Sequence, residues 1–168
     1  MNEKLEGTSA GDAAHAGSQY LAFTLGGEEY GIDILRVQEI KGYSATTSIP
    51  NAPAHVKGVM NLRGTVVPVI DVRLKFGMEA RAYDRFTVIV VVNVGARVVG
   101  LVVDSVCDVL DIPRDEIDPV PELGAGIDVS VMQGIARNND RLITLLDIDA
   151  VVDLDVVGGG AAESAAAA

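Results

Sequence analysis

The strongest constraint on the fold is that the chain of 168 residues contains one structural unit twice. Four stretches in the first half match four in the second half, in the same order, at an offset of roughly 70 residues that drifts as loops lengthen. The matched stretches are 25–32 with 94–101, 37–40 with 106–109, 49–50 with 120–121, and 57–59 plus 66–71 with 133–135 plus 142–147. A duplicated unit explains this shared order better than chance does.

Each copy of the unit is predicted to consist of short β-strands. Apolar runs separated by turn residues such as Gly26-Gly27, Arg63-Gly64 and Asn138-Asn139-Asp140 predict hairpins. The expected strands are 20–25, 29–32, 37–43, 56–62, 66–72, 87–94, 98–103, 131–136 and 142–146. Val, Ile and Leu supply most of the large apolar side chains, and β-branched residues favour a pleated sheet. About five strands in each half are enough to form a small closed barrel, which leaves no exposed sheet edge.

Only short helical segments are expected between these strands. Asp33 can cap one helical turn, and 148–154 can close the domain as a short helix. Residues 1–18 and 158–168 show no hydrophobic period, so both are predicted to be disordered tails. The folded part is therefore predicted to span 19–157, with a junction between the two copies near the polar residues 81–86.

The net charge of −11 argues against several classes of partner. It repels the phosphates of nucleic acids, and no stripe of Lys and Arg with interleaved aromatic residues overcomes that repulsion. The same charge disfavours an anionic membrane surface, and every apolar run is shorter than the ~20 residues that a membrane helix needs. No secretory signal opens the sequence, so a cytoplasmic protein is expected.

The sequence offers little catalytic chemistry. His15 and His55 have no neighbours at metal-ligand spacing, and no glycine-rich loop leads into a phosphate-holding helix, so neither a metal nor another cofactor is expected. Cys107, the single cysteine, sits in an apolar run and is predicted to be a core or half-buried residue. Many carboxylates of the second half are expected to be solvated, namely Asp104, Asp108, Asp111, Asp115, Glu116 and Asp118. We therefore expect that the protein is not an enzyme.

One polar pair stands out from this background. Arg63 lies at a predicted hairpin tip, and Glu39 lies on the predicted strand 37–43. An arginine fork can hold a carboxylate through two parallel hydrogen bonds, which fixes both side chains. The residues alone leave open whether Arg63 is a solvated turn residue or a functional one.

From residue 20 to about residue 155 the sequence resembles the CheW family of chemotaxis adaptors. The resemblance rests on YLAFTLGGEEYGIDI at 20–34, RVQEI at 36–40, KGVMNLRG at 57–64 with VPVID at 67–71, and RVVGLVVD at 97–104. The family implies an all-β fold of two SH3-like five-stranded β-barrel subdomains around a shared core. The internal repeat agrees with such a pair of barrels.

The resemblance also implies partners. They are the cytoplasmic tips of methyl-accepting chemotaxis receptors, the regulatory domain of the histidine kinase CheA, and further copies of the adaptor in ring-like arrays recruited to the membrane. The receptor-facing segments of the family carry over to Val37, Glu39, Ile40, Gly58, Asn61 and Arg63. Kinase and ring contacts are expected at barrel ends and loops, including Leu123 in the segment 119–123.

The roles of the receptor-facing residues follow from their chemistry. Val37 and Ile40 would supply an apolar groove for a receptor helix. Arg63 would orient the contact, and Glu39 would orient Arg63, so we expect these two side chains to lie within hydrogen-bond distance.

Two other interpretations stay open. The same domain occurs in CheA and in CheV, so the chain could be a regulatory module of either type, although no receiver, phosphotransfer or ATPase region accompanies it. An acidic β-barrel enzyme would instead use its clustered carboxylates, and would need one in a cleft with a strongly raised pKa.

Overall fold

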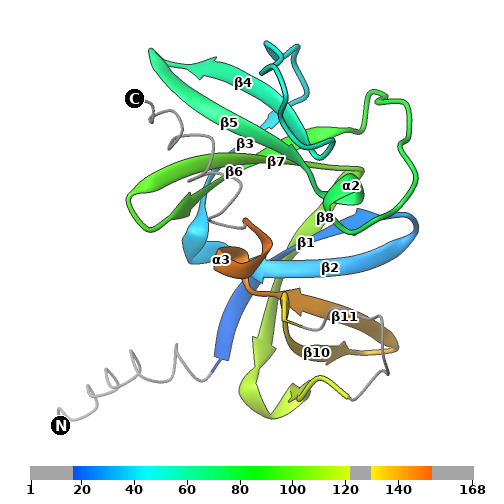
Figure 1. Ribbon diagram of the computed structural model, residues 1–168. Helices are drawn as coiled ribbons and strands as arrows, with labels where there is room; N and C mark the ends of the chain where they lie inside the picture. Colours follow the sequence, from blue (N-terminus) through cyan, green and yellow to red (C-terminus); the bar gives the residue numbers. More distant parts are fainter. Residues whose placement is uncertain (1–16, 122–129, 153–168) are drawn as a thin grey trace, which may run out of the picture.

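The structure is a computed structural model that describes residues 17–121 and 130–152 (Figure 1). In chain order its elements are β1 (Gly17–Leu25), β2 (Glu28–Asp33), the 3-10 turn η1 (Ile34–Arg36), β3 (Val37–Gly42), β4 (Val56–Leu62), β5 (Thr65–Asp71), α2 (Val72–Lys75), β6 (Val88–Val94), β7 (Arg97–Val103), β8 (Ser105–Pro113), the 3-10 turn η2 (Arg114–Glu116), β9 (Ile117–Asp118), β10 (Met132–Asn138), β11 (Arg141–Leu146) and α3 (Ile148–Val151). β1 thus begins two residues inside the predicted tail 1–18. The rest of that tail, and the tail 158–168, lie outside the described residues.

The strands form two sheets, which confirms the all-β prediction. One sheet has six strands in the order β8-β1-β2-β11-β10-β9, and the other has five in the order β3-β6-β7-β5-β4. Neighbouring strands are antiparallel, except that β2 pairs parallel with β11 and β5 pairs parallel with β7. The helical segments are single turns, as expected, and α3 lies beside both sheets (Figure 1).

The two sheets do not correspond to the two halves of the sequence. The hairpin β1–β2 joins the strands of the second half, and the hairpin β6–β7 joins β3, β4 and β5 of the first half. The expectation that each half closes a barrel by itself is therefore wrong, because the two copies exchange their first hairpins. The exchange suits β6, because its residues 89–92 are apolar and buried on both faces of the strand. One face fills the five-stranded sheet and the other fills the space between the sheets.

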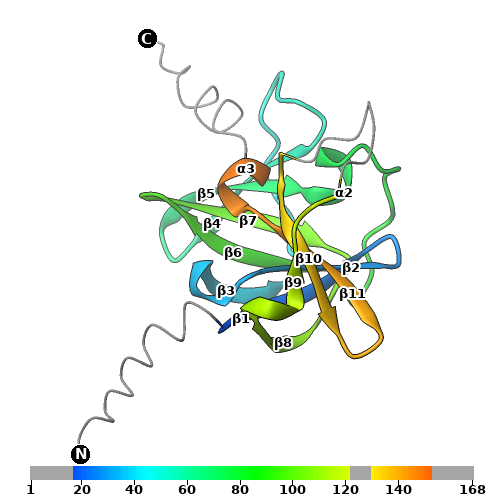
Figure 2. The same cartoon turned by 90° about the horizontal axis from the view of Figure 1, so that it is seen from below.

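Each sheet curls and brings its two edge strands toward each other. These two edge strands follow one another in the sequence. β8 leads through the three residues of η2 directly into β9, which pairs with β10 (Figure 2). The equivalent contact in the other sheet is an isolated bridge between Thr47 and Val59, which ties the segment after β3 to β4. The two sheets therefore share one design, and the sixth strand is the two-residue β9 in the place of a single bridge.

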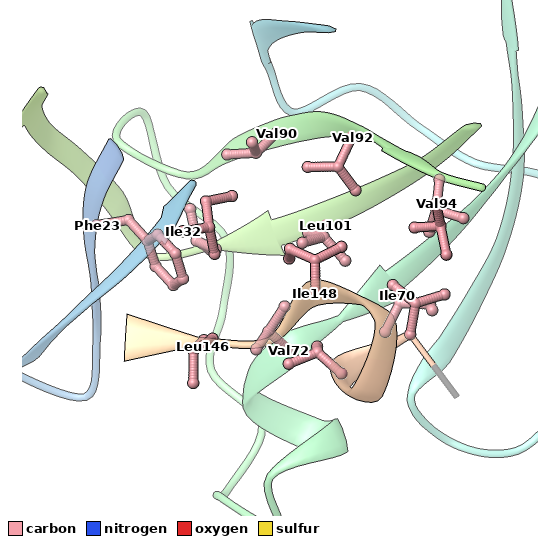
Figure 3. Close-up of a cluster of buried hydrophobic side chains, with 14 of the residues drawn as sticks. Phe23, Ile32, Ile70, Val72, Val90, Val92, Val94, Leu101, Leu146 and Ile148 are labelled. Carbon is pink, nitrogen blue, oxygen red and sulfur yellow. The ribbon is translucent and has the colours of Figure 1, made fainter. Parts of the chain in front are cut away.

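The buried residues form three clusters, as expected for two barrels around a shared core. The largest cluster lies between the sheets and takes side chains from both, including Phe23, Ile32, Val92, Leu101 and Ile148 (Figure 3). A second cluster fills the five-stranded sheet, and a third fills the six-stranded sheet.

A glycine makes room in the middle of each small cluster. A Cβ atom on Gly100 would come within 2.8 Å of Ile89, and one on Gly31 within 3.1 Å of Leu145. These two glycines occupy matching positions in the repeat, so both barrels solve the same packing problem in the same way.

The chain passes from one sheet to the other at two points, and an ion pair holds each of them. Between β2 and β3, Arg36 pairs with Asp149 of α3 and also donates to the Asn93 carbonyl. Between β7 and β8, Asp104 accepts from Arg73 of α2 at 2.8 Å.

Asp104 has further partners. It accepts from Arg81 at 2.9 Å and from the Gly26 amide at 2.8 Å. The prediction that Asp104 is a solvated carboxylate is wrong, because its side chain is only 10% exposed.

Over the residues that the structure describes, no helix is long and apolar enough to cross a membrane.

Candidate functional site

The predicted pairing of Glu39 with Arg63 is confirmed. Arg63 Nη2 lies 2.6 Å from Glu39 Oε2, and Arg63 Nη1 lies 3.4 Å from Glu39 Oε1, so the guanidinium holds the carboxylate with both arms. Glu39 lies on β3, and Arg63 lies in the turn that joins β4 to β5. Since β3 and β4 are the two edge strands of the five-stranded sheet, the ion pair spans the seam where that sheet closes.

A β-bulge at Gln38 separates the charged and the apolar side chains of β3. Val37 pairs with Val92 and Ile40 with Val90, so both face the side of the shared core, whereas Glu39 pairs with Val91 and faces the core of its own sheet. Val37 is half-buried against the shared core, while the side chain of Ile40 stays 42% exposed. The bulge therefore sets an apolar edge on one face of β3 and a charged clamp on the other.

The hairpin turn holds Arg63 in a fixed backbone conformation. Arg63 and Gly64 have φ values of 52° and 89°, which is the left-handed pair that a two-residue hairpin turn requires. The side chain of Asn61 braces this turn, because its Oδ1 accepts from the Gly64 amide at 2.9 Å. Asn61 is itself exposed, and this hydrogen bond positions the turn that carries Arg63.

The ion pair shifts both pKa values in the direction that keeps it charged. Hydrogen bonding and attraction by Arg63 lower the pKa of Glu39, and Lys41 adds to this effect. In return, Glu39 raises the pKa of Arg63. The side chain of Arg63 is 67% exposed, whereas that of Glu39 is 28% exposed. The arginine is therefore available to a partner while the carboxylate orients it from behind.

Gly58 differs from the other predicted residues because it is buried. Its φ is +137°, and a Cβ atom there would overlap the backbone carbonyl of Thr47, which crosses β4 at this point. Thr47 and Val59 exchange two backbone hydrogen bonds across the same spot, each 2.9 Å long. Gly58 can therefore affect a partner only through the segment that runs from β3 to β4.

Sequence reasoning missed an exposed apolar residue beside the predicted ones. Val66 pairs with Asn61 across the β4–β5 ladder, and its side chain is 66% exposed. The signal was present, because Val67 and Val69 are buried and strand alternation turns Val66 to the opposite face. Ile40 and Val66 are thus exposed apolar residues, the first next to Glu39 on β3 and the second opposite Asn61 on β5.

Two further predictions have different outcomes. Leu123 lies outside the described residues. Cys107 was predicted to be half-buried or in the core, which is wrong, because it is exposed. The reason is a second bulge: Val106 pairs with Phe23 and Asp108 with Ala22, so Cys107 is the extra, unpaired residue between them.

In the ranges 17–121 and 130–152, no group of three His, Cys, Asp or Glu side chains could hold a metal ion. An open depression there is lined by Arg36, Asn93, Val94, Gly95 and Asp149 and includes none of the predicted site residues.

Comparison with known proteins identifies the domain. The family model described as "CheW-like domain" matches residues 19–156. Chemotaxis protein CheW of Klebsiella aerogenes is 49% identical over 79% of this chain and 80% of its own length, and that of Rhizobium meliloti is 38% identical over 82% and 88%. The crystal structure of the scaffolding protein TtCheW from Thermoanaerobacter tengcongensis superimposes with a TM-score of 0.76, at 32% identity, over 81% of this chain and 92% of that one. The chain therefore belongs to the CheW-like family.

Proposed function

We propose that this chain is a non-enzymatic adaptor that couples methyl-accepting chemotaxis receptors to the histidine kinase CheA. The observation that carries the proposal is the Arg63 clamp: an exposed guanidinium that Glu39 and a braced turn hold at the seam of the five-stranded sheet. The strands of this sheet also carry the exposed apolar residues Ile40 and Val66. Membership of the CheW-like family and the likeness to a protein titled a scaffold support it.

The receptor-facing surface consists of Val37, Glu39, Ile40, Asn61 and Arg63. Gly58 contributes indirectly, through the segment between β3 and β4 that packs against it. A receptor helix would place its apolar face against Ile40 and a carboxylate or a helix-end carbonyl against Arg63. Because the guanidinium is already oriented, little side-chain entropy is lost when the partner binds.

The kinase would bind a different surface, at barrel ends and in the segment 119–123 that contains Leu123. Further copies of the chain would occupy the remaining positions of a ring, since a head-to-tail contact that closes generates one. We place the adaptor in the cytoplasm, bound to membrane-associated receptor arrays.

A reconstitution of three purified proteins tests the proposal. The full chain is mixed with a receptor signalling domain and with CheA, and both the sedimented complex and the rate of kinase autophosphorylation are measured. We expect a ternary complex and a faster kinase with the chain present. Binding to neither partner would refute the proposal.

Two arginine variants locate the receptor surface in the same assay. Arg63→Ala should lose receptor binding and keep kinase binding. Arg97→Ala is the matched control, because Arg97 is an exposed residue at another hairpin turn, between β6 and β7. Equal losses in the two variants would remove Arg63 from the receptor surface.

A further inference from the structure

A second surface of the five-stranded sheet has the features of a protein docking site. It consists of Tyr43, Lys57, Tyr83, Arg85 and Phe86, which we call the aromatic–cationic patch. Tyr43 follows the end of β3, and its amide donates to the carbonyl of Thr87, the residue after Phe86. Residues after β3, in β4 and before β6 thus meet in one place.

Tyr83 is anchored at the centre of the patch. Its hydroxyl donates to Asp71, a carboxylate that is only 2% exposed. Burial and this hydrogen bond raise the pKa of Tyr83, so the hydroxyl remains a donor. The ring of Tyr43 packs against that of Tyr83 with centroids 4.4 Å apart, and Lys57 Nζ lies 5.8 Å from the Tyr83 centroid. The aromatic platform is therefore rigid.

A braced turn holds Phe86 in solvent beside this platform. Asp84 Oδ1 accepts from the Phe86 amide at 2.8 Å, and Thr87 Oγ1 accepts from the Asp84 amide at 2.9 Å. The side chain of Phe86 is 57% exposed, and the Arg85 guanidinium lies 4.8 Å from its ring centroid. An exposed aromatic ring on a rigid turn is the kind of anchor that protein interfaces use.

The patch also gathers cations that lack carboxylate partners. Within the described residues, Lys57, Arg85 and Arg97 form no ion pair, and two of these three, Lys57 and Arg85, belong to the patch. The nearby carboxylate of Asp84 does not neutralise them, because it accepts from the Phe86 amide and pairs with Arg81. In a chain of net charge −11, the patch thus presents two cations that form no ion pair, Lys57 and Arg85.

We propose that the aromatic–cationic patch docks an acidic segment of a partner protein that also carries an apolar side chain. Carboxylates of the segment would pair with Lys57 and Arg85, and its apolar side chain would cover Phe86. A nucleic acid or an anionic lipid surface fits less well, because it extends beyond the patch to where the net charge of −11 repels its phosphates. A short acidic segment can contact Lys57 and Arg85 alone. The surface is separate from the Arg63 clamp, so the two proposals can fail independently.

The test uses the full-length chain labelled with nitrogen-15 and follows its amide signals by NMR. The probe is a short peptide in which Glu alternates with Leu and Phe, compared with the same peptide carrying Lys in place of Glu. The acidic peptide should shift the amide signals of 43–47, 57 and 83–88, and added salt should weaken the binding of this peptide. The Lys peptide should shift none of them. Shifts that spread over the whole surface would overturn the proposal.

Four variants assign the effect to the patch. Arg85→Glu and Phe86→Ala should each lower the affinity for the acidic peptide roughly tenfold. Arg97→Glu and Leu142→Ala should change that affinity less than about twofold. Arg97 is an equally unpaired arginine, and Leu142 is 65% exposed, close to the 57% of Phe86. The spectrum of each variant reports whether it is folded. Equal losses in all four variants would overturn the proposal.

Other occupants give different outcomes in the same spectra. The same spectra are recorded with vesicles of phosphatidylcholine and phosphatidylglycerol, and with a single-stranded oligonucleotide. If either of these shifts the patch signals and the acidic peptide does not, the proposal is overturned in favour of a polyanion site. Patch signals that move with the concentration of the chain alone would overturn it in favour of a second copy.

Discussion

Arg73 and Asp149 occupy equivalent positions in the two copies of the repeat but carry opposite charges. Each is the second residue of the single helical turn that follows a hairpin, Arg73 in α2 and Asp149 in α3. Each forms an ion pair with a residue at one of the two points where the chain passes between the sheets. Arg73 pairs with Asp104, and Asp149 pairs with Arg36. The duplicated unit therefore keeps the ion pair at both crossings and reverses its polarity.

The two crossings should differ in their contribution to stability. The side chains of Arg73 and Asp104 are 14% and 10% exposed, whereas those of Arg36 and Asp149 are 30% and 60% exposed. Asp104→Ala leaves a nearly buried guanidinium without its carboxylate and should lower the free energy of unfolding by about 3–5 kcal/mol. Asp149→Ala, the matched control, should cost only about 0–1 kcal/mol. Urea unfolding measures both, and similar losses would show that burial does not set the difference.

Substitutions of Arg63 should separate coupling from stability. Arg63→Ala removes the clamp but keeps a side chain at φ 52°, so its melting temperature should stay within a few degrees of the parent value. Arg63→Gly removes the clamp and suits the left-handed conformation, so it should be at least as stable as Arg63→Ala. Both variants should lose receptor binding. Thermal unfolding monitored by circular dichroism checks the order, and a collapsed fold in either variant would make Arg63 a structural residue.

The clamp should respond to acid in a predictable direction. The pKa of Glu39 is lowered in the folded chain, so its contribution to stability is fully present above the ordinary glutamate value of about 4.3 and is lost as the pH falls through the lowered value. A carbon-13 titration of the Glu39 carboxyl measures this pKa. In Arg63→Ala the value should rise toward the ordinary one, since Arg63 is the main cause of the shift. Identical titrations in parent and variant would contradict the assignment.

Gly58 should be far less tolerant of substitution than Gly42 on the neighbouring edge strand. Gly58→Ala places a Cβ atom against the Thr47 carbonyl at a φ of +137°, so it should cost at least about 2 kcal/mol. A Cβ atom on Gly42 meets nothing within 4 Å, so Gly42→Ala should change stability by less than about 0.5 kcal/mol. Chemical unfolding of the two variants compares them, and an unaffected Gly58→Ala would mean that the Thr47 bridge is not rigid.

Most strands could be predicted from the sequence because their signals are local. The turns at Gly26-Gly27 and Arg63-Gly64 lie where the structure has them, and Asp33 caps η1 by accepting from the Leu35 amide. Resemblance to a known family predicted the Glu39–Arg63 relationship as a functional one, and alternation along β3 could not, because the bulge at Gln38 changes which residues share a face.

The exchange of hairpins could not be predicted in the same way. It depends on parallel pairing of β2 with β11 and of β7 with β5, strands far apart in the chain, and no local pattern specifies such partners. Asp104 was missed for a related reason, since Arg73, Arg81 and Gly26 meet it only after the sheets have formed. Long-range pairing decided both cases.

The single cysteine should react slowly although it is exposed. Partial burial and the nearby carboxylates of Glu29 and Asp108 raise the pKa of the Cys107 thiol, while Arg141 opposes them. Only the thiolate attacks an alkylating reagent, so iodoacetamide should label the folded chain more slowly at neutral pH than the same chain in urea, and the rate should rise with pH.

Variants of its neighbours should move that rate in opposite directions. Asp108→Asn removes one repelling charge and should speed labelling. Arg141→Ala should slow labelling, because it removes the favourable cation and also releases Glu29, which Arg141 holds at 2.6 Å. Asp111→Asn is the matched control, since Asp111 is an exposed carboxylate on the same strand and is not among the causes of the shift. Equal rates in all three variants would show that access to the bulge, and not the charge around the thiol, limits the reaction.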